Sequence, residues 1–478
     1  MTPKRPRRRF GTLKGVIHDA QGFWLSAEQR PEPNAILRSE VSADVVVLGG
    51  GFSGMWTAWL IREAEPNARV VLLEAGLCGH GPSGRNGGFA NSMWFGLGSM
   101  RDDFGDEGTL ALARKAEEAI GEIGEWCSTQ EVDASFRHGG YLQASTAKAF
   151  DQVWEPAVAA CQALGRADAV EVLRADEVQK RCASPIFRGA AFFPASATVN
   201  PARLALGLRR RLIEAGVEVY ELSKVRGLQA GPGGVEVRTD EGVVRAGHAV
   251  LATGGAQEAV APLRRRLTLT SSHMVITEPV PDVIEEIGWT GGECITDGRH
   301  MLHYFRTTED GRIAFGWGGG RMVYGARLCG HAEVDAGVAA EVASHLTRFF
   351  PQLEGRRIDH AWGGPIDVSP NHTPMVGTLD GRVHYAFGYT GNGVGPSRLV
   401  GHILASLALD RRDDYSRLPI VEHKEIRVPP EPFRYIGGTV IRDALLRKER
   451  AEELDLEPDP LSTLVSGIPE RVGVQIGR

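Results

Sequence analysis

Three glycines at the spacing Gly49-x-Gly51-x-x-Gly54 are the residues of this chain whose types and positions most clearly suit a chemical task. They follow an apolar run, residues 45–48, and precede a helical pattern over residues 55–62. In such a loop the first glycine permits a tight turn, the second lets the backbone approach a pyrophosphate, and the third lets helix and strand pack closely. The amides and the positive dipole end of that helix stabilise phosphate charge. The spacing therefore predicts a bound dinucleotide.

An acidic residue stands where a dinucleotide needs one. Residues 70–73 predict a second short apolar strand, and Glu74 follows it, twenty residues after Gly54. A carboxylate at this distance binds ribose hydroxyls. Because strand, loop, helix, strand and acid come in this order, they are more specific than the glycines alone. The alternative is a structural turn followed by an ordinary surface glutamate.

Composition narrows the class of protein. The chain has 478 residues, 42% of them hydrophobic and 24% charged, which predicts a globular protein long enough for two domains. Its net charge of -6 gives no reason to expect nucleic-acid binding, and it has no run of eighteen apolar residues that would predict a membrane span. The basic residues 1–10 lack a following apolar segment and predict a solvated, disordered start.

The cysteines are scattered, without a CxxC pair or the ligand spacing of a zinc site. We therefore expect reduced thiols, a cytoplasmic location and no bound metal. The six are Cys78, Cys127, Cys161, Cys182, Cys294 and Cys329.

The order of helical and strand patterns predicts a chain that passes repeatedly between two domains. Helical spacing covers residues 110–127 and 336–350, alternating strands cover 301–306 and 313–316, and a further helix is expected over 440–454. We expect an N-terminal extension (1–42), a discontinuous nucleotide domain (43–100, 190–267 and 361–410), a second domain (101–189 and 268–360) and a C-terminal extension (411–478). For that extension the sequence suggests only packing or oligomer contact.

These pieces together resemble the D-amino-acid-oxidase-like flavoprotein family, and most of all its gamma-glutamylputrescine-oxidase-like members. The resemblance runs from Ala43 to about Leu409, through the glycine loop, Glu74 and residues 83–88, 252–255 and 388–395. It implies an α/β fold in which a Rossmann-like FAD-binding domain is interrupted by an antiparallel-sheet α+β substrate domain that roofs the flavin.

The resemblance implies particular FAD contacts. Val225 would hold the adenine through its backbone, residues 83–88 would pass the pyrophosphate and flavin, and residues 388–395 would close on the pyrimidine end of the flavin ring. Amides of that last loop and the helix that follows it would stabilise negative charge on the reduced ring. The full expected set is Gly49, Gly51, Phe52, Ser53, Gly54, Glu74, Ala75, Ser83, Gly84, Arg85, Asn86, Gly87, Gly88, Val225, Thr253, Gly254, Gly388, Gly391, Asn392, Gly393, Val394 and Gly395.

Some relatives attach FAD covalently through histidine or cysteine. Cys78 and His80 lie in the general region, but in histidyl-linked relatives the linking residue falls nearer the position of Arg85 here. We therefore expect non-covalent FAD.

In this family an amine loses a hydride from its α-carbon to flavin N5, and the resulting imine hydrolyses. Alternation in residues 300–306 places Tyr304 on one face and His303 on the other. We expect Tyr304 to supply a substrate-binding hydroxyl, with His303 as the competitor if the register is reversed; either could instead be an ordinary sheet residue. Trp362 is the expected aromatic wall, whereas Trp317 suits core packing at least as well.

The identity of the substrate stays open at this point. Arg299, Arg306 or Arg321 could clamp a carboxylate or phosphonate, although a solvated arginine is the commoner explanation of each. Family members that act on amino acids carry such a clamp, and those that act on polyamine derivatives need not.

Three other functions remain as alternatives. The same fold oxidises 2-hydroxy acids or glycerol phosphate, and some relatives are non-catalytic flavoprotein subunits, although the intact glycine loop argues against a mere scaffold. An NAD(P)H-dependent reductase is disfavoured because no second strand-loop-helix glycine motif is found. The expected partners are a small amine or amino acid and an electron acceptor, either O2 or another carrier; the oligomeric state cannot be read.

Overall fold

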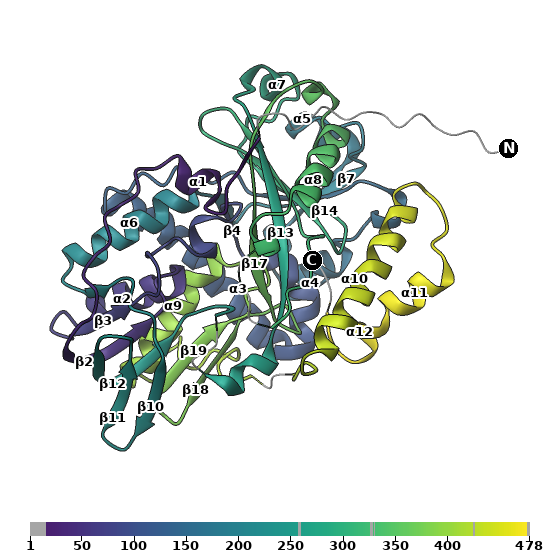
Figure 1. Ribbon diagram of the computed structural model, residues 1–478. Helices are drawn as coiled ribbons and strands as arrows, with labels where there is room; N and C mark the ends of the chain where they lie inside the picture. Colours follow the sequence, from purple (N-terminus) through teal and green to yellow (C-terminus); the bar gives the residue numbers. More distant parts are fainter. Residues whose placement is uncertain (1–15, 257–259, 326–327, 329, 424–425, 476–478) are drawn as a thin grey trace.

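The apolar run before the glycine loop forms β2 (Glu40–Leu48), the middle of a mostly parallel sheet. The computed structural model describes residues 16–256, 260–325, 328, 330–423 and 426–475. Within these residues the sheet has eight strands, at the lower left of Figure 1. In spatial order they are β10 (Gly227–Gly231), β11 (Gly234–Arg238), β12 (Val243–Leu251), β2, β3 (Val70–Leu73) and β9 (Glu218–Tyr220), with β19 (Val383–Phe387) beside β12 and β18 (Met375–Leu379) beside β19.

β12 is a single strand of nine residues. It is continuous because it pairs in parallel with β2 along its whole length, from Val243 opposite Glu40 to Leu251 opposite Leu48. Its other edge is shared, first by β11 and then by β19. The strand therefore ends beside the glycine loop.

The second sheet is mostly antiparallel and has nine strands among the described residues. Only the pairs β1–β17 and β14–β5 are parallel in it. In spatial order its strands are β1 (Ile17–His18), β17 (Ile358–Val368), β13 (Thr268–Thr277), β16 (Ile313–Trp317), β15 (His303–Thr307), β14 (Cys294–Asp297), β5 (Tyr141–Ser145), β7 (Gly189–Phe193) and β6 (Glu171–Arg174). A small third sheet pairs β4 (Phe89–Asn91) with β8 (Ser196–Thr198). The fold is thus mixed α/β.

At two points the chain leaves the antiparallel sheet later than the domain boundaries expected at 189/190 and 360/361. β7 stays in the antiparallel sheet to Phe193, and β17 stays there to Val368, with Trp362 opposite Met274. The Gly363-Gly364 pair does not end the strand. A Cβ at Gly363 would lie 2.6 Å from the His273 ring, so this glycine allows a close contact between strands. The division into two domains stays a prediction.

Helices cover both sheets. The predicted helix over 110–127 is the second part of α3, which includes a non-helical residue, Gly105, at φ 66°. The helices are α1 (Gly22–Ser26), α2 (Phe52–Ala64), α3 (Leu97–Thr129), α4 (Glu155–Ala163), α5 (Ala175–Arg181), α6 (Pro201–Glu214), α7 (Pro281–Glu286), α8 (Ala336–Phe349), α9 (Val394–Ala408), α10 (Phe433–Glu452), α11 (Pro460–Ser466) and α12 (Ile468–Arg471). Among the residues that the structure describes, no helix has the length and apolar character to cross a membrane.

The C-terminal extension forms α10, α11 and α12, drawn in yellow at the right of Figure 1. α10 starts at Phe433, seven residues before the predicted helix over 440–454. The prediction starts late because Gly437 and Gly438 lie inside α10, and adjacent glycines normally end a helical pattern. At Gly438 an added Cβ would lie 2.6 Å from Met322 Cε, so this glycine lets the helix approach the segment after β16.

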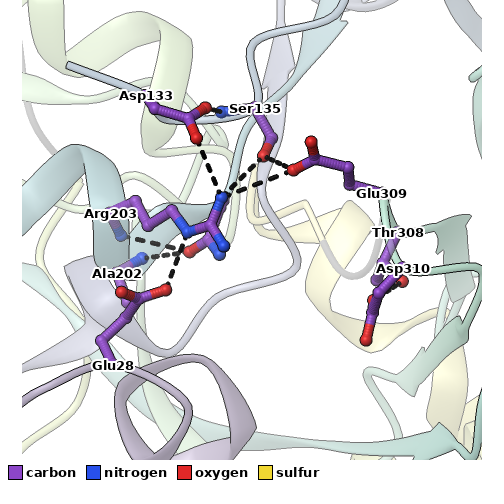
Figure 2. A network of polar contacts seen from close by, with 9 residues as sticks. Glu28, Asp133, Ser135, Ala202, Arg203, Thr308, Glu309 and Asp310 are labelled. Carbon is purple, nitrogen blue, oxygen red and sulfur yellow. Dashed lines mark hydrogen bonds and ion pairs between the residues drawn. The ribbon is translucent and has the colours of Figure 1, made fainter. Parts of the chain in front are cut away.

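One arginine links three distant parts of the chain. Arg203, on α6, donates to Glu28 at 2.8 Å and lies 3.3 Å from Asp133 and 3.4 Å from Glu309, as Figure 2 shows. These acids come from the segment after α1, the loop after α3 and the turn between β15 and β16. Since the group is partly exposed, it contributes more to the relative placement of these segments than to stability.

A buried ion pair braces the start of the glycine-rich segment that follows β3. Glu221, fully buried, is bound by Arg209 at 2.8 Å and accepts hydrogen bonds from the amides of Asn34 and Cys78. Burial opposes ionisation of Glu221, but these donors outweigh it and lower its pKa. The pair therefore fixes residues 76–78 relative to α6.

Glu221→Gln should reduce the free energy of unfolding by about 3 kcal/mol, because it leaves a largely buried guanidinium without its carboxylate. Chemical denaturation would measure this. Glu218→Gln is the matched control on β9, the strand that Glu221 directly follows: Glu218 pairs with a half-exposed Arg69, and its loss should cost under about 1 kcal/mol. Equal losses in the free energy of unfolding for the two variants would contradict the assignment of Glu221 and Arg209 as a stabilising buried ion pair.

Candidate active site

A single large cavity lies between the two sheets and the C-terminal extension. Its volume is about 1550 Å³, and its wall runs from Glu74 and Val225 past the glycine loop to Tyr304, Trp362 and α10. Pockets for a drug-sized ligand have about 300–1000 Å³. The cavity therefore has room for a dinucleotide and a second molecule.

Two glycines of the loop, Gly49 and Gly54, are required by close contacts with backbone oxygens. A Cβ at Gly54 would lie 2.0 Å from the Gly49 oxygen, and one at Gly49 would lie 2.4 Å from the Ala252 oxygen. Gly51 caps α2 and faces the cavity. The wall at this point is backbone and the amino end of a helix, which suits a pyrophosphate.

Glu74 lies at the other end of the part of the cavity that suits a dinucleotide. It is partly buried and accepts hydrogen bonds from the amides of Gly50 and Gly76, each at 2.7 Å. Burial raises its pKa, and the amides partly offset that shift. A carboxylate fixed in this way at the cavity wall fits a ribose hydroxyl pair, so the residues present fit FAD.

Most of the expected cofactor residues line this cavity: Gly49, Gly51, Phe52, Ser53, Glu74, Ala75, Ser83, Arg85, Asn86, Gly87, Val225, Thr253, Gly254, Gly391, Asn392, Gly393 and Val394. Five glycines do not, and they serve packing behind the wall. A Cβ added at Gly84 would lie 2.3 Å from the Gly79 oxygen, one at Gly88 would lie 2.1 Å from the Val199 oxygen, and one at Gly395 would lie 2.6 Å from the Asn91 oxygen. Gly54 is described above, and Gly388 has φ 79°.

The loop before α9 is held by a residue that the sequence analysis missed. Asp367, at the end of β17, lines the cavity and accepts a hydrogen bond from the Gly388 amide at 2.7 Å. Burial raises its pKa to about 6. Next to it, the Tyr389 hydroxyl bonds to Ser53 Oγ at 2.6 Å, joining the two cofactor loops. No sequence pattern predicts this role for a single aspartate near the end of a strand.

Tyr304 lies on the cavity side of β15, as expected. Its hydroxyl donates to Ser272 Oγ at 2.7 Å, which in turn donates to the Trp317 carbonyl at 2.9 Å. Its ring packs on Gly87, where an added Cβ would lie 3.2 Å away. Burial raises the Tyr304 pKa to about 12, so the hydroxyl stays protonated at neutral pH.

His303 lies on the opposite face of β15, in the core and away from the cavity. Its Nδ1 is 2.7 Å from Asp297 and its Nε2 is 2.8 Å from His345 Nδ1. Burial lowers its pKa to about 4. Trp317 packs on this same face, stacked at 6.2 Å from the His303 ring. Strand alternation offered both faces, and the structure places Tyr304 rather than His303 at the cavity.

Trp362 forms part of the cavity wall and is 2% exposed. Its indole nitrogen donates to the Arg85 carbonyl at 2.8 Å. A Cβ at Gly22 would lie 2.8 Å from its ring, so α1 holds it from behind. The ring is therefore fixed as a wall next to the segment expected to pass the flavin.

The three candidate clamps lie away from the cavity. Arg306 is buried and donates to the Val199 and Gly88 carbonyls, Arg299 pairs with Asp297 and Glu453, and Arg321 bonds to Asp335. Each guanidinium is used to hold the scaffold.

The arginines that do line the cavity are also bound by protein groups. Arg85 pairs with Glu333 at 2.9 Å, Arg434 with Glu431 at 2.7 Å, and Arg442 donates to the carbonyls of Gly319 and Gly320. Among the described lining residues, each arginine thus has a partner that competes with a substrate carboxylate.

The described cysteines are free and buried, and Cys329 lies outside the described residues. Cys78 is 1% exposed behind the glycine loop, where a Cβ at Gly50 would lie 2.5 Å from its sulfur. Neither Cys78 nor His80 is part of the described cavity wall. Non-covalent attachment stays a prediction.

Comparisons with known proteins agree with this geometry. A family model described as FAD dependent oxidoreductase (DAO) matches residues 44–407. The chain is 30% identical over 445 residues to gamma-glutamylputrescine oxidoreductase of Escherichia coli K12, covering 90% of this chain and 100% of that protein. It is 24% identical to glycine oxidase of Bacillus licheniformis, over 77% and 93% of the two chains.

Solved structures show the same fold at lower identity. Glycine oxidase from Geobacillus kaustophilus aligns with a TM-score of 0.64 at 19% identity, over 81% of this chain and 100% of that one. L-proline dehydrogenase from P. horikoshii aligns with a TM-score of 0.65 at 18% identity, over 80% and 96%.

Gly54→Ala should remove most of the bound FAD, because the new methyl group would lie 2.0 Å from the Gly49 oxygen and displace the pyrophosphate loop. The ratio of flavin to protein absorbance in the purified variant measures this. Gly121→Ala is the control, since that glycine lies in α3 with open space around its Cβ position. Normal FAD content in Gly54→Ala would show that the loop tolerates a side chain.

Asp367→Asn should stabilise the FAD-free protein at pH 8 but not at pH 4. The folded pKa of Asp367 is about 6, above its ordinary value of 3.8, so the group's favourable contribution is present below about pH 4 and is lost as pH rises through 6. About two pKa units correspond to about 3 kcal/mol.

Thermal unfolding of both proteins at the two pH values checks this prediction. The control is Asp380→Asn, which removes a charge from the exposed turn after β18. A stabilisation of Asp367→Asn that does not depend on pH would contradict the buried-carboxylate explanation.

Proposed function

The chain belongs to the DAO family of FAD-dependent oxidoreductases, and we propose that it oxidises the C–N bond of an amine whose reacting carbon bears no carboxylate. The chain is thus an enzyme of a family that acts on amines or amino acids. FAD, which the glycine loop and Glu74 would hold, would supply a two-electron acceptor for the hydride of the α-carbon, and water would hydrolyse the resulting imine.

This proposal rests on the observation that the arginines in and near the cavity are already bound by other groups of the protein. Arg85, Arg434 and Arg442 each bind a protein carboxylate or carbonyl, and Arg299, Arg306 and Arg321 hold the scaffold. Recognition of an α-carboxylate depends on a guanidinium with donors to spare, usually in a bidentate contact. The relative with 30% identity bears the name of a polyamine derivative, gamma-glutamylputrescine, which supports an amine of this kind.

Tyr304 and Trp362 are the residues proposed to hold the amine. The Tyr304 hydroxyl is protonated and already ordered by its donation to Ser272, so its oxygen can accept a hydrogen bond from an amine N–H without first losing mobility. Trp362 excludes water from the same part of the cavity. Positioning and exclusion of water are what this reaction asks of the protein.

The loop from Gly388 to α9 is proposed to stabilise negative charge on the reduced cofactor. Gly391, Asn392, Gly393 and Val394 line the cavity at the amino end of α9, whose amides and dipole favour an anion. Asp367 positions the loop from behind by accepting the Gly388 amide.

The proposal is tested by following the visible spectrum of the purified protein during anaerobic addition of amines, amino acids, aminophosphonates and 2-hydroxy acids. Bleaching of the flavin band by amines, and not by the matching α-amino acids, supports it. Bleaching by amino acids alone, or by hydroxy acids alone, overturns it and favours the corresponding alternative. Admission of air to the reduced protein then shows whether O2 accepts the electrons.

Tyr304→Phe should lower kcat/KM for the amine that bleaches the flavin by about 10- to 100-fold, the range for losing one positioned hydrogen bond to a reacting group. Steady-state kinetics measures this. Tyr324→Phe is the matched control because Tyr324 is 46% exposed and its ring contacts Tyr435 outside the described cavity wall. An unchanged kcat/KM for Tyr304→Phe would remove the hydroxyl from the proposal.

A further inference from the structure

The cavity continues beyond Tyr304 and Trp362 into an outer chamber that the C-terminal extension walls. Its apolar lining there includes Phe433, Ile468 and Val472, which are exposed to solvent, and Gly437, Gly438 and Ile441, which are partly buried. All six lie after residue 407, where the family match ends. The chamber is therefore formed by a part of this chain outside the shared domain.

The extension is held over the cavity by its polar side chains. Arg442 donates to the Gly319 and Gly320 carbonyls beyond β16, and Arg434 donates to the Leu267 carbonyl at 2.9 Å. Glu449 accepts the His300 amide at 2.6 Å. Arg434 and Arg442 also line the cavity, but their guanidinium groups bind its walls, so the other residues of α10 at the chamber are glycine and apolar.

Gly437 marks open space at the chamber wall. Glycine inside a helix is unfavourable and usually has a packing or functional reason. Gly438 has a packing reason, its close contact with Met322 Cε, whereas a Cβ at Gly437 would meet nothing within 4 Å. Gly437 lines the cavity, so its missing side chain leaves room there.

From these observations we propose that the outer chamber binds an extended apolar arm of the substrate, so that the enzyme acts on amines with a long alkyl or arylalkyl tail. The amine end lies beside Tyr304 and Trp362, and the tail lies along Gly437, Ile441 and Val472. This inference rests on the proposed function, since it names the class of amine. A tail in this chamber loses water-exposed apolar surface, while a polar tail would lose hydrogen bonds to water.

The first experiment measures kcat/KM of the holoenzyme for n-alkylamines from propylamine to dodecylamine. The expected result is an increase of up to about fourfold per added methylene until the chamber is full, since fourfold corresponds to complete burial of each group. ω-Hydroxyalkylamines and ω-aminocarboxylates of the same length should be poorer substrates. A flat series, or a preference for the polar tails, overturns the inference.

The second experiment fills the chamber from α10. Gly437→Leu places a side chain in the open space, so the ratio of kcat/KM for decylamine to that for propylamine should fall by at least about tenfold, with a smaller fall for Gly437→Ala. Both changes raise helix propensity and should leave α10 folded. Gly121→Leu, a helical glycine with open space outside the described cavity wall, should keep the wild-type ratio. A wild-type ratio in Gly437→Leu overturns the inference.

A binding measurement separates failure of this inference from failure of the proposed function. n-Alkyltrimethylammonium ions lack the amine lone pair, and their binding can be followed by the perturbation of the flavin spectrum. Affinity that rises with chain length, and falls in Gly437→Leu, supports the chamber even if no amine reduces the flavin, which would refute the proposed function alone. Amine oxidation with no chain-length dependence in either assay refutes the chamber alone.

Discussion

The close contact of backbone on backbone at the glycine loop is the constraint on which the rest of the structure depends. The Gly49 carbonyl lies where a Gly54 side chain would be, and the Ala252 carbonyl lies where a Gly49 side chain would be. The end of β12 and the start of α2 can meet only because both positions lack a Cβ. This contact makes the cavity wall from amides and carbonyls, and it fixes the parallel sheet against the helix that faces the phosphates.

The charged residues around the cavity are mostly used to build it. Arg306 holds the carbonyls of Gly88 and Val199, and Arg85 binds Glu333 while its carbonyl accepts from Trp362. A buried guanidinium is stable only with such partners. As a result the walls around Tyr304 and Trp362 present mainly hydroxyl, aromatic and aliphatic groups, and we expect substrates to be distinguished by shape and burial of apolar surface more than by charge.

What the sequence predicted and what it missed follow from how local each signal is. The glycine spacing and Glu74 lie within about thirty residues, so the strand, the loop and the acid could be inferred before any tertiary contact was known. The choice between Tyr304 and His303 could not be made, because alternation gives two faces and only the neighbouring strands decide which one meets the cavity. Asp367 acts through a loop twenty-one residues away, and no local pattern marks it. The start of α10 was missed because two adjacent glycines normally end a helical pattern.

β17 runs without interruption from the antiparallel sheet to the loop that precedes α9. Its centre pairs with β13, and Asp367, next to its last residue, accepts the amide of Gly388. The Asp367 carbonyl also accepts the amide of Thr390, so rotation of one sheet against the other would have to break both hydrogen bonds. The C-terminal helices are attached to the cavity walls through side chains, among them Arg434, Arg442 and Glu449, and such contacts separate at lower cost than paired strands. Exchange of small molecules with solvent is therefore expected to follow the movement of these helices, while the distance between the two sheets stays constant through the catalytic cycle.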